Sequence, residues 1–396
     1  MRIGVLTTSF PRYAGDVPGQ FVHGFAAALA GRGHTLDVLA PEPSERRSAP
    51  GDPGIELHWI RYLWPRVAQR TFYGAGVPDN LRRDPLAWLG ALGFPVALFH
   101  AAARRLEHSD ALVSHWALPS AFVAGAVRGG RPHLAVFHSA DVHLLSRLPA
   151  RPHLCSWLLH NATRLLFVTR AARDRFIAWL PENDREHAAG RCTVQPMGID
   201  APVAPSEARS ALRERLRLDR FALLTLARLV PVKGLCEALA ELAHRADLQW
   251  LIAGGGPLAE ELARRARSVR IEARLLGQVG GAHKRELLQA CDALLLPSRV
   301  LPSGRSEGAP TVVLEAMAHG LPVIASDVGG IAELVDSPCT GLLVPPDASG
   351  ALERAVDSLA GDPVLRSRLA ERAAAVAQAH YWSALAPKLE RLLTSA

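Results

Sequence analysis

Short apolar runs with the length of buried strands alternate with helical patterns along this chain, in two separate series. A segment with two prolines and a glycine, residues 196–202, separates the series. The strand-like runs of the first series are Ile3–Thr7, Thr35–Ala40, Ala111–Ser114, Leu134–His138 and Leu165–Thr169. Those of the second series are Ala222–Ala227, Gln249–Ala253, Ile271–Leu276, Ala293–Leu296, Pro322–Ala325 and Gly341–Val344. Helical patterns such as Phe21–Gly31 and Ala171–Leu180 lie between the runs.

This alternation predicts an α/β fold, with parallel sheets that are covered by helices on both faces. Two series imply two Rossmann-like domains that face a cleft, and 396 residues are enough for two cores. We expect the domains to span residues 1–196 and 197–380. The amphipathic segment 381–396 should form a helix that can pack back on the first domain. Ligands of such sheets bind beyond the carboxyl ends of the strands, so the site should lie in the loops that follow them.

The composition, 49% hydrophobic and 21% charged, is typical of a folded globular chain. Its five cysteines are widely spaced and form no CxxC pattern, which indicates reduced thiols in a cytosolic protein and no structural zinc. The first apolar stretch is too short for a signal peptide and is expected to be a buried strand. The apolar segment Leu86–Ala103 contains Pro95 and His100, so we expect a buried helix there, with a membrane-surface helix as the alternative.

Two glutamates flank a predicted helix start near the C-terminal end of the chain. Glu307 lies in the loop before it, and Glu315 lies more than one turn inside the helix. Proline favours the first helical position, and the free N–H groups and dipole of a helix start bind phosphate. The residues of this start are Gly308, Ala309, Pro310, Thr311 and Val312. One carboxylate on each side of a bound diphosphate suits a nucleotide sugar, with its sugar at one end and its ribose at the other.

Two cations lie in the loop after the first strand of the second series. Arg228 and Lys233 are five residues apart and can clamp a diphosphate, the arginine as a fork and the lysine as a point charge. The chain has three lysines and 42 arginines, so a lysine at this position indicates that a compact cation is needed. A pair of ordinary solvent-exposed side chains is the alternative.

A glycine turn follows the next strand. The segment Gly254–Ala259, with Gly256 in the turn, matches the GxGxxA pattern of dinucleotide-binding sites, and Glu272 follows it. Alone, this pattern would predict an NAD-dependent oxidoreductase, but the paired glutamates and the two cations have no role in such a site. The following loop contains Val279 and the second lysine, Lys284, and its backbone could pair with the edge of a nucleotide base.

Two features of the first series also lie after strands. Gly15 and Gly19 occupy the loop after the first strand, where glycines allow the backbone to approach a ligand closely. An ordinary turn is an equally good interpretation of that loop. His138 ends a later strand, and from there it could donate a hydrogen bond to a sugar hydroxyl. With 16 histidines in the chain, a structural role for His138 is the alternative.

Taken together, these motifs resemble the retaining GT-B glycosyltransferases of family 4 along the whole chain. The segment Glu307–Glu315 is similar to the E-x7-E motif of the family, and residues 316–335 resemble its usual continuation. The pattern around Tyr73-Gly-Ala-Gly, His115-Trp116 and Pro119 resembles members that build exopolysaccharides of the colanic-acid type. The resemblance implies a hexosyltransferase that uses a nucleotide diphosphate sugar and acts in cell-surface polysaccharide biosynthesis. No metal is expected, because the two cations can stabilise the leaving charge and no DxD motif is evident near the loops of the site. No further cofactor is expected.

The resemblance also implies a role for each motif of the second domain, which would bind the nucleotide sugar. The residue that matches Glu307 contacts hydroxyls of the transferred sugar, and the one that matches Glu315 holds the ribose. Those that match Arg228 and Lys233 hold the diphosphate. Together with the helix start, these cations would stabilise the negative charge that develops on the leaving nucleotide.

The remaining roles are also implied by the resemblance alone. Val279 and Lys284 would lie beside the base. The first domain would bind the acceptor, with the Gly15–Gly19 loop facing the diphosphate and His138 meeting the sugar. Family members often have glycine after this histidine, whereas this chain has Ser139, whose Cβ would crowd the site.

The partners follow from the charge and from the resemblance. Residues 1–200 contain 22 arginines, no lysine and 16 acidic residues, so this half of the chain prefers an anionic partner, although a generally arginine-rich composition would explain the same numbers. We expect a UDP- or GDP-sugar as donor, and a glycan or polyprenyl-linked acceptor at the inner face of the membrane. The N-terminal residues expected to meet an anionic membrane are Trp59, Arg61, Trp64, Arg66 and Arg70. Nucleic acid is not expected, because no basic stripe is interleaved with aromatic residues. A non-catalytic protein that binds nucleotide sugars remains an alternative.

Overall fold

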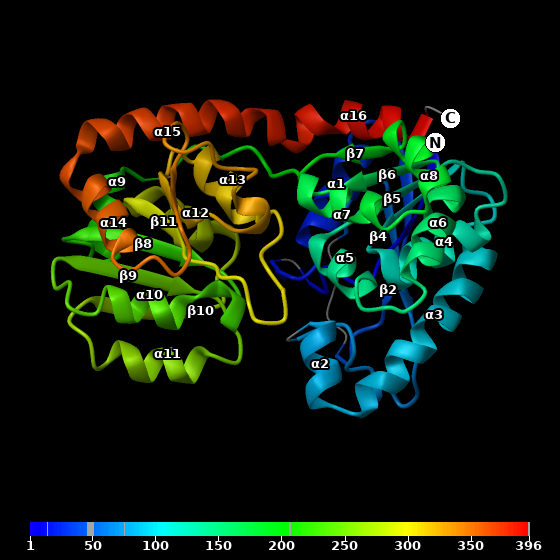
Figure 1. The fold of residues 1–396 in the computed structure, drawn as a ribbon, viewed down its shortest axis with the longest axis horizontal. Helices are drawn as coiled ribbons and strands as arrows, with labels where there is room; N and C mark the ends of the chain where they lie inside the picture. Colours follow the sequence, from blue (N-terminus) through cyan, green and yellow to red (C-terminus); the bar gives the residue numbers. More distant parts are fainter. Residues whose placement is uncertain (14, 46–50, 75, 206, 395–396) are drawn as a thin grey trace. The chain divides into compact units, whose positions relative to one another are not determined.

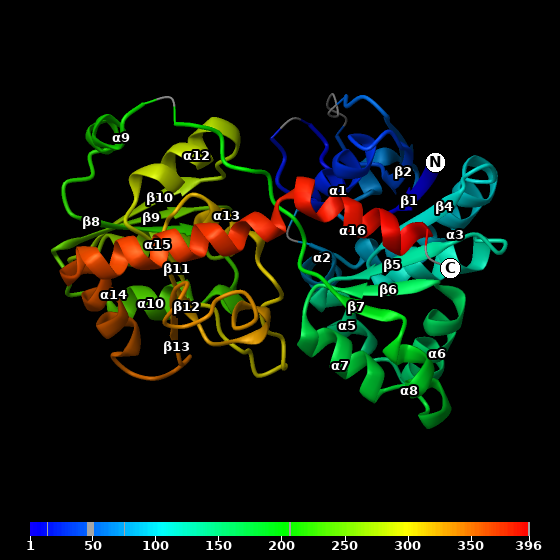
Figure 2. The same ribbon diagram turned by 90° about the horizontal axis from the view of Figure 1, so that it is seen from above.

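The computed structural model describes residues 1–13, 15–45, 51–74, 76–205 and 207–394. The chain forms two compact units (Figures 1 and 2). The first consists of Met1–Gly198 and Trp382–Ala396, and the second of Ile199–Tyr381. Ala14 of the predicted glycine loop and Ala75 of the Tyr73-Gly-Ala-Gly pattern lie outside the described residues.

The first unit is built on a seven-stranded parallel sheet with the order β3-β2-β1-β4-β5-β6-β7. Val5 of β1 is in register with Val38 of β2 on one side and with Val113 of β4 on the other. The strands are β1 Arg2–Leu6, β2 Thr35–Pro41, β3 Ile55–Ile60, β4 Ala111–His115, β5 His133–Phe137, β6 Arg164–Phe167 and β7 Cys192–Val194. The helices are α1 Gln20–Ala30, α2 Val77–Arg83, α3 Leu86–Arg105, α4 Phe122–Val127, α5 Ser139–Leu145, α6 Arg151–Asn161, α7 Arg170–Ala178 and α8 Glu182–Ala189.

The second unit is built on a six-stranded parallel sheet with the order β10-β9-β8-β11-β12-β13. The strands are β8 Phe221–Leu226, β9 Leu248–Ala253, β10 Glu272–Gly277, β11 Ala293–Leu296, β12 Val323–Ser326 and β13 Leu342–Val344. The helices are α9 Arg209–Arg215, α10 Leu235–Glu241, α11 Ala259–Ala266, α12 Gly281–Ala290, α13 Thr311–Ala318, α14 Ala351–Gly361 and α15 Pro363–Ala377. The prediction of an α/β fold with parallel sheets is therefore confirmed.

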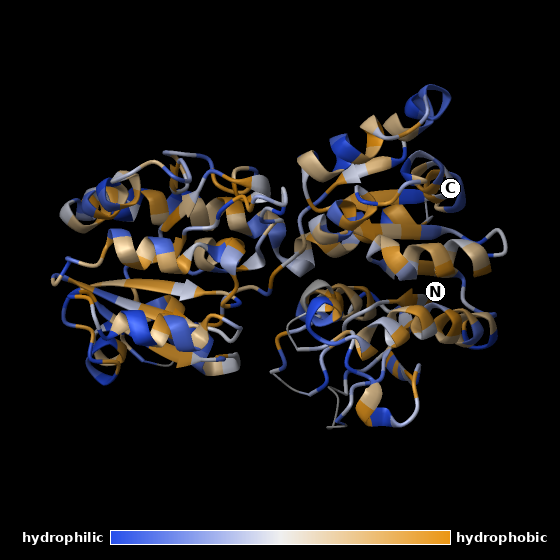
Figure 3. Cartoon of the chain, turned by 60° about the horizontal axis from the view of Figure 1, so that its bottom comes forward, coloured by the Kyte–Doolittle hydropathy of each residue, from blue (hydrophilic) through white to orange (hydrophobic). Residues whose placement is uncertain are grey.

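The central strands form the core of each unit. Every residue of β4, β5, β9, β11 and β12 is buried, which explains their nearly continuous apolar sequences. Figure 3 shows the strands as predominantly hydrophobic and the helices as mixed. In the second unit, the fully buried Trp250 satisfies its indole N–H by donating to Thr225 Oγ1 at 3.0 Å.

The last helix, α16 (Trp382–Thr394), lies beside α1 in the first unit (Figure 2). The ring of Trp382 lies against Gly24 and Gly198. A Cβ at these glycines would come within 2.3 Å and 2.5 Å of the ring, so only glycine fits at either position. Glu390 also accepts hydrogen bonds from Arg32 at 2.6 Å and His34 at 3.0 Å.

Two features of the first unit differ from the predictions. The edge strands β3 and β7 are missed by the sequence pattern because β3 mixes polar with apolar residues and β7 has only three residues. The prediction of a buried helix over 86–103 is wrong for one face of α3. Phe94 and Leu98 are fully buried, whereas Leu92 is 70% exposed.

Candidate active site

The carboxyl edge of the second sheet brings the loops after β8 and β11 together. These two strands are neighbours, and the chain proceeds from them in opposite directions, through β9 and β10 on one side and β12 and β13 on the other. A reversal of this kind opens a crevice at the strand ends, which is where parallel sheets bind ligands. The predicted cations follow β8, and Glu307 follows β11.

Lys233 and Glu307 form an ion pair beside this reversal. Lys233 Nζ lies 2.6 Å from Glu307 Oε2, and the two side chains are 12% and 13% exposed. Ser298 Oγ donates to the same carboxylate oxygen at 3.0 Å. The sequence did not single out Ser298, because one serine after a strand carries no distinctive signal. A mostly buried carboxylate is thus held between a cation and a hydroxyl.

Close backbone packing holds this pair in position. Gly234 follows Lys233 with a φ of +63°, and a Cβ there would lie 2.0 Å from the carbonyl oxygen of Pro297. Gly329 has a φ of +54°, and its Cβ would lie 2.1 Å from the carbonyl oxygen of Glu307. A side chain at either glycine would push the loops apart, so the spacing of the ion pair depends on both.

The helix start lies between the two glutamates, but it begins one residue later than predicted. Pro310 has φ −71° and ψ 117°, which is extended, and α13 begins at Thr311. The φ that proline imposes suits both a helix and the residue before one, so sequence cannot separate the two positions. The flanking residues Gly308, Ala309 and Val312 are partly buried. A helix leaves its first N–H groups without helical acceptors, so this start can bind an anion.

Glu315 forms a second ion pair, with Lys284 of α12. Lys284 Nζ lies 2.7 Å from Glu315 Oε2, and the side chains are 26% and 22% exposed. His319, one turn further along, lies with Nδ1 2.8 Å from the carbonyl oxygen of Glu315. Two of the three lysines of the chain therefore pair with the two glutamates of the motif. The sequence placed Lys284 beside a base and did not predict this contact.

The glycine turn after β9 packs against the loop that carries Arg228, whose side chain is exposed. Gly254 and Gly256 have φ values of +147° and +155°. A Cβ at Gly254 would lie 1.8 Å from the carbonyl oxygen of Ala227, and one at Gly256 would lie 2.4 Å from that of Leu229. The glycines are thus required for the close approach of two loops, which explains the GxGxxA pattern without a dinucleotide.

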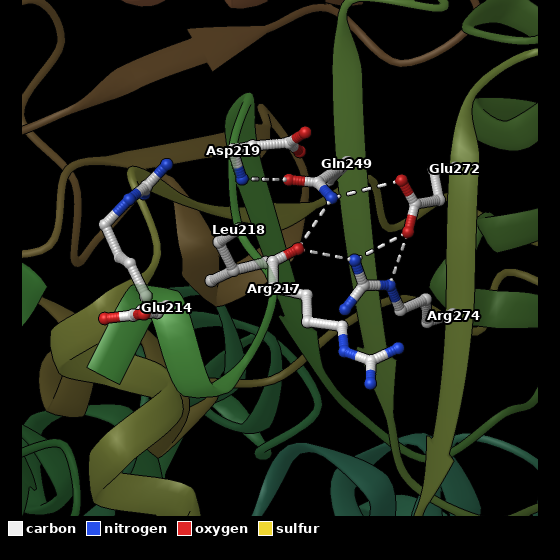
Figure 4. Close-up of a pocket in the computed structure, with 8 residues that line it drawn as sticks. Glu214, Arg217, Leu218, Asp219, Gln249, Glu272 and Arg274 are labelled. Atoms are coloured by element: carbon white, nitrogen blue, oxygen red, sulfur yellow. Dashed lines mark hydrogen bonds and ion pairs between the residues drawn. The ribbon is translucent and has the colours of Figure 1, made fainter. Parts of the chain in front are cut away.

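Val279 is partly buried and packs against the core of the second unit. A separate hollow lies at the amino ends of β9 and β10 (Figure 4). Its polar side chains bond to one another: Gln249 donates to Glu272 at 3.1 Å, and Arg274 Nε donates to Glu272 at 2.7 Å. Because this hollow is at the edge opposite to the motif loops, we regard it as a structural network and not as the active site.

In the first unit, His138 directly precedes α5, and its ring lies within a cluster of aromatic rings. It follows β5, and its ring centroid lies 4.8 Å from that of Phe21 and 4.9 Å from that of Trp116. Its Nε2 lies 3.2 Å from Nδ1 of His115, and these two rings are stacked. Trp116 has a φ of +69°, which is strained for a residue with a side chain and is typical of functional loops.

Burial determines the charge of this cluster. It lowers the pKa of His138 to about 3, and it lowers the pKa of His115 well below its usual value, with a further contribution from His138. Burial also raises the pKa of Asp141 to about 7, although the backbone N–H of Ala117 donates to this carboxyl at 2.7 Å. Both histidines are therefore neutral at neutral pH. The Oγ of Ser139 is buried and has no partner among the described residues.

The predicted glycine loop after β1 is held by an internal ion pair. Arg12 Nε donates to Asp16 at 2.7 Å, and the guanidinium lies 5.0 Å from the ring centroid of Tyr73. Gly19 precedes α1 with a φ of +77°, and a Cβ there would lie 2.6 Å from the backbone of this same loop. Gly15 has a φ of +86° with open space around it. This is consistent with a loop that leaves room for a ligand near Gly15.

Family descriptions match both units. Residues 209–376 match "Glycosyl transferases group 1", and residues 18–191 match "Glycosyl transferase 4-like domain". The chain is 33% identical to the GDP-mannose-dependent alpha-(1-6)-phosphatidylinositol monomannoside mannosyltransferase of Mycobacterium tuberculosis, over 99% of this chain and 98% of that protein. It is 27% identical to a glycogen synthase of Mycobacterium tuberculosis, over 94% of this chain and 89% of that protein.

Solved structures share the fold across the whole chain. Sucrose-phosphate synthase from Thermosynechococcus elongatus has a TM-score of 0.77 at 22% identity, covering 99% of this chain and 98% of the other. Anabaena HepE in complex with UDP-glucose has a TM-score of 0.72 at 19% identity, covering 100% of both chains.

The two parallel-sheet units and the motif loops define a glycosyltransferase with the GT-B fold. The chain belongs to the glycosyltransferases of family 4, a retaining family, so the predicted resemblance is confirmed. The comparisons support hexosyl transfer from a nucleotide sugar in polysaccharide or glycolipid synthesis. They do not support an NAD-dependent oxidoreductase or a non-catalytic binding protein. The colanic-acid subgroup and the roles of individual residues stay predictions.

Proposed function

We propose that this enzyme transfers a hexose, with retention, from a UDP- or GDP-sugar to a lipid-linked acceptor at the inner face of the membrane. The observation that carries the proposal is the pair of ion pairs, Lys233–Glu307 and Lys284–Glu315, on either side of the start of α13. A relative of 33% identity uses GDP-mannose and a phosphatidylinositol glycolipid according to its name, which favours a GDP-sugar and a lipid acceptor.

The diphosphate would be held by cations and backbone amides of the second unit. Lys233 is paired with a carboxylate that the donor can replace, because a phosphate oxygen offers the same charge and a similar hydrogen bond. Arg228 lies on the same loop, and the N–H groups of Thr311 and Val312 lie at the helix start. Once released from Lys233, Glu307 would accept hydrogen bonds from hydroxyls of the sugar.

The ribose and base would lie on the other side of α13. Glu315 would accept hydrogen bonds from the ribose hydroxyls, and Lys284 would keep this carboxylate oriented. The loop that contains Val279 would face the base. This arrangement follows the order of the motifs along the sheet, with the sugar nearest to Glu307 and the base nearest to β10.

The proposed reaction depends more on stabilising the developing charge than on covalent catalysis by the enzyme. The bond between the anomeric carbon and the diphosphate breaks, and its electron pair leaves on the nucleotide. A new bond forms to the acceptor oxygen, which loses its proton. Lys233, Arg228 and the α13 start would stabilise the leaving charge without a metal. His138, neutral at neutral pH, would offer a hydrogen bond in place of a charge.

The first test identifies the donor. A thermal-shift screen of UDP-, GDP-, ADP- and dTDP-sugars should give a clear stabilisation with one nucleotide, because a ligand that binds the folded state raises its stability. Titration calorimetry with that nucleoside diphosphate should then show a loss of about tenfold or more for Lys233→Ala, since a charge-assisted hydrogen bond contributes about 1.5–3 kcal/mol. Lys388, exposed on α16, provides the matched control. Equal affinity of Lys233→Ala and wild type would remove this lysine from the donor site.

A further inference from the structure

The outer face of α3 is apolar from Leu86 to Phe99, and its large side chains are mostly exposed. The helix lies along the outside of that unit, with α2 at one end and α4 beside it (Figure 1). Its large exposed side chains are Leu86 at 52%, Trp88 at 56%, Leu89 at 55%, Leu92 at 70%, Val96 at 59% and Phe99 at 41%. We call this set the α3 face. Contiguous apolar surface of this kind marks an interaction site.

The spacing of the α3 face follows the helical period. All members except Trp88 recur at intervals of three and four residues, and Trp88 lies four residues before Leu92, so the set shares one side of the helix. No charged residue interrupts the sequence between Asp84 and Arg104. The helix is also long and apolar enough to cross a membrane. It is not a span in this fold, however, because Phe94 and Leu98 on its other side are fully buried in the core of the unit.

Neighbouring segments extend the apolar surface. The short helix Arg66–Ala68 contacts α3. Trp64, which precedes this helix, and Val67, which lies in it, are 82% and 60% exposed. On another side, α3 and α4 form an open groove of about 310 Å³, which is lined by Pro95, Val96, Phe99, Phe122, Val123 and Ala126. Exposed tryptophan is typical of the interface between water and lipid, since its ring is apolar and its N–H is polar.

The charges around the α3 face are mostly positive. Residues 61–105 contain seven arginines, two aspartates, and no lysine or glutamate. Arg70, Arg83 and Arg104 are exposed at the surrounding loop, at α2 and at the end of α3. The predicted membrane patch is smaller than expected: Arg61 and Arg66 both pair with the buried Glu42, which offsets one of their two charges, and the partly buried Trp59 packs against the core.

We infer that the α3 face docks this enzyme onto an anionic lipid bilayer, lying in the plane of the interface with the arginines at the lipid headgroups. The positive charge around the α3 face indicates which partner binds it. Apolar side chains with basic residues at their border match the acyl region and the anionic headgroups of a leaflet. A second copy of this chain would instead bring two positive borders together, which is unfavourable. The inference deepens the proposed function, on which it rests for the lipid-linked nature of the acceptor.

Vesicle binding by the full chain tests the inference. Sedimentation is measured with vesicles of phosphatidylcholine alone and with vesicles that also contain phosphatidylglycerol. Wild type should bind the anionic vesicles more strongly, and the binding should weaken as salt is added. Leu92→Glu should lower this binding about tenfold or more, because it places a charge in the apolar layer. The matched control is Val364→Glu on α15, where the original side chain is 78% exposed and the helix belongs to the second unit.

The outcomes separate this inference from the proposed function. Equal binding to both kinds of vesicle, or wild-type binding by Leu92→Glu, would overturn the membrane surface. A second outcome would also overturn it: wild type binds no vesicles and is a dimer in analytical ultracentrifugation, and Leu92→Glu is a monomer. The α3 face would then be an interface between two copies of the chain. Calorimetry with the nucleoside diphosphate should give the same affinity for wild type and Leu92→Glu. If wild type binds vesicles but no nucleotide, the proposed function is contradicted, whereas the α3 face is still supported as a membrane-binding surface.

Discussion

Replacing Glu307 with glutamine tests the central contact of the proposed donor site. The carboxylate is mostly buried and accepts hydrogen bonds from Lys233 at 2.6 Å and Ser298 at 3.0 Å. Glutamine has the same shape and keeps one acceptor oxygen, so it removes the charge and little else. We expect a loss of about 1–2 kcal/mol in stability, since an ion pair of intermediate burial becomes an ordinary hydrogen bond. For a unit of this size, each 1 kcal/mol corresponds to about 2–4 °C in Tm.

The effect on transfer should be much larger than the effect on the fold. If Glu307 accepts hydrogen bonds from the sugar, the loss of its charge costs about 1.5–3 kcal/mol for each bond. This corresponds to a turnover about 10 to 100 times lower. The free nucleoside diphosphate carries no sugar and should behave in the opposite way. Lys233 would no longer have a competing carboxylate, so affinity should stay the same or rise about fivefold, which is the equivalent of about 1 kcal/mol.

The assay therefore combines three measurements on Glu307→Gln: Tm, turnover with the full donor, and calorimetric affinity for the nucleoside diphosphate. Glu307→Asp serves as the control, because it keeps the charge and shortens the side chain. The reasoning would be refuted by a variant of normal Tm whose nucleoside diphosphate affinity falls more than about tenfold. In that case Glu307 would act by holding Lys233 in position, and the exchange of carboxylate for phosphate would be wrong. Wild-type turnover would remove Glu307 from the sugar site.

Two further predictions concern the structural support of the two units. Gly234→Ala should weaken nucleoside diphosphate binding and destabilise the second unit, because the new Cβ would clash with the carbonyl oxygen of Pro297. The control Gly281→Ala, at a similar φ of +54° but with open space around it, should lower stability by only about 1 kcal/mol. Equal unfolding midpoints in urea for the two variants would contradict this prediction. His133 is buried, with its Nδ1 3.1 Å from a carbonyl oxygen, and burial lowers its pKa to about 4. Between pH 6.5 and 4 the unfolded chain therefore binds a proton that the folded chain does not bind. As the pH falls through this range, the free energy of unfolding should fall by up to about 1.4 kcal/mol per pH unit. His133→Gln lacks this dependence, so its stability deficit relative to wild type should shrink over that range; a constant deficit would mean that the histidine titrates normally.

Periodicity and loop chemistry allowed the sequence to predict much of the fold. The strands of the second sheet were located to within one residue at each end, because buried parallel strands are short apolar runs and the loops after them contain glycine or proline. Arg228, Glu307 and Val279 were also predicted in the correct loops, whereas Lys284, predicted in the loop after β10, lies on α12. The edge strands β3 and β7 of the first sheet were missed, because β3 mixes polar with apolar residues and β7 has only three residues, whereas the partly buried edge strands β10 and β13 of the second sheet were located. Apolar composition alone could not show which face of α3 meets the core.

The sequence could not predict how the motif side chains pair. Lys284 and Glu315 are 31 residues apart, and their contact depends on how α12 and α13 pack. Ser298 joins Glu307 only because the chain doubles back after β11. Likewise, the glycines after β9 were interpreted as a ligand turn, although what they accommodate is the backbone of the loop after β8. These features are set by distances between segments, and a pattern along one segment does not contain them.

The exchange proposed at the Lys233–Glu307 ion pair would explain why this cation is a lysine. The chain uses arginine almost everywhere, yet the cations that pair with Glu307 and Glu315 are lysines. Arginine would grip a carboxylate with two parallel hydrogen bonds and would be hard to separate from it. Lysine makes one contact through a compact, rotatable ammonium group, so a phosphate can take the place of the carboxylate without a second bond being broken. Before the donor binds, Lys233 and Glu307 would thus neutralise each other. When the donor binds, Lys233 would pair with a phosphate, and Glu307 would be free to accept hydrogen bonds from the sugar.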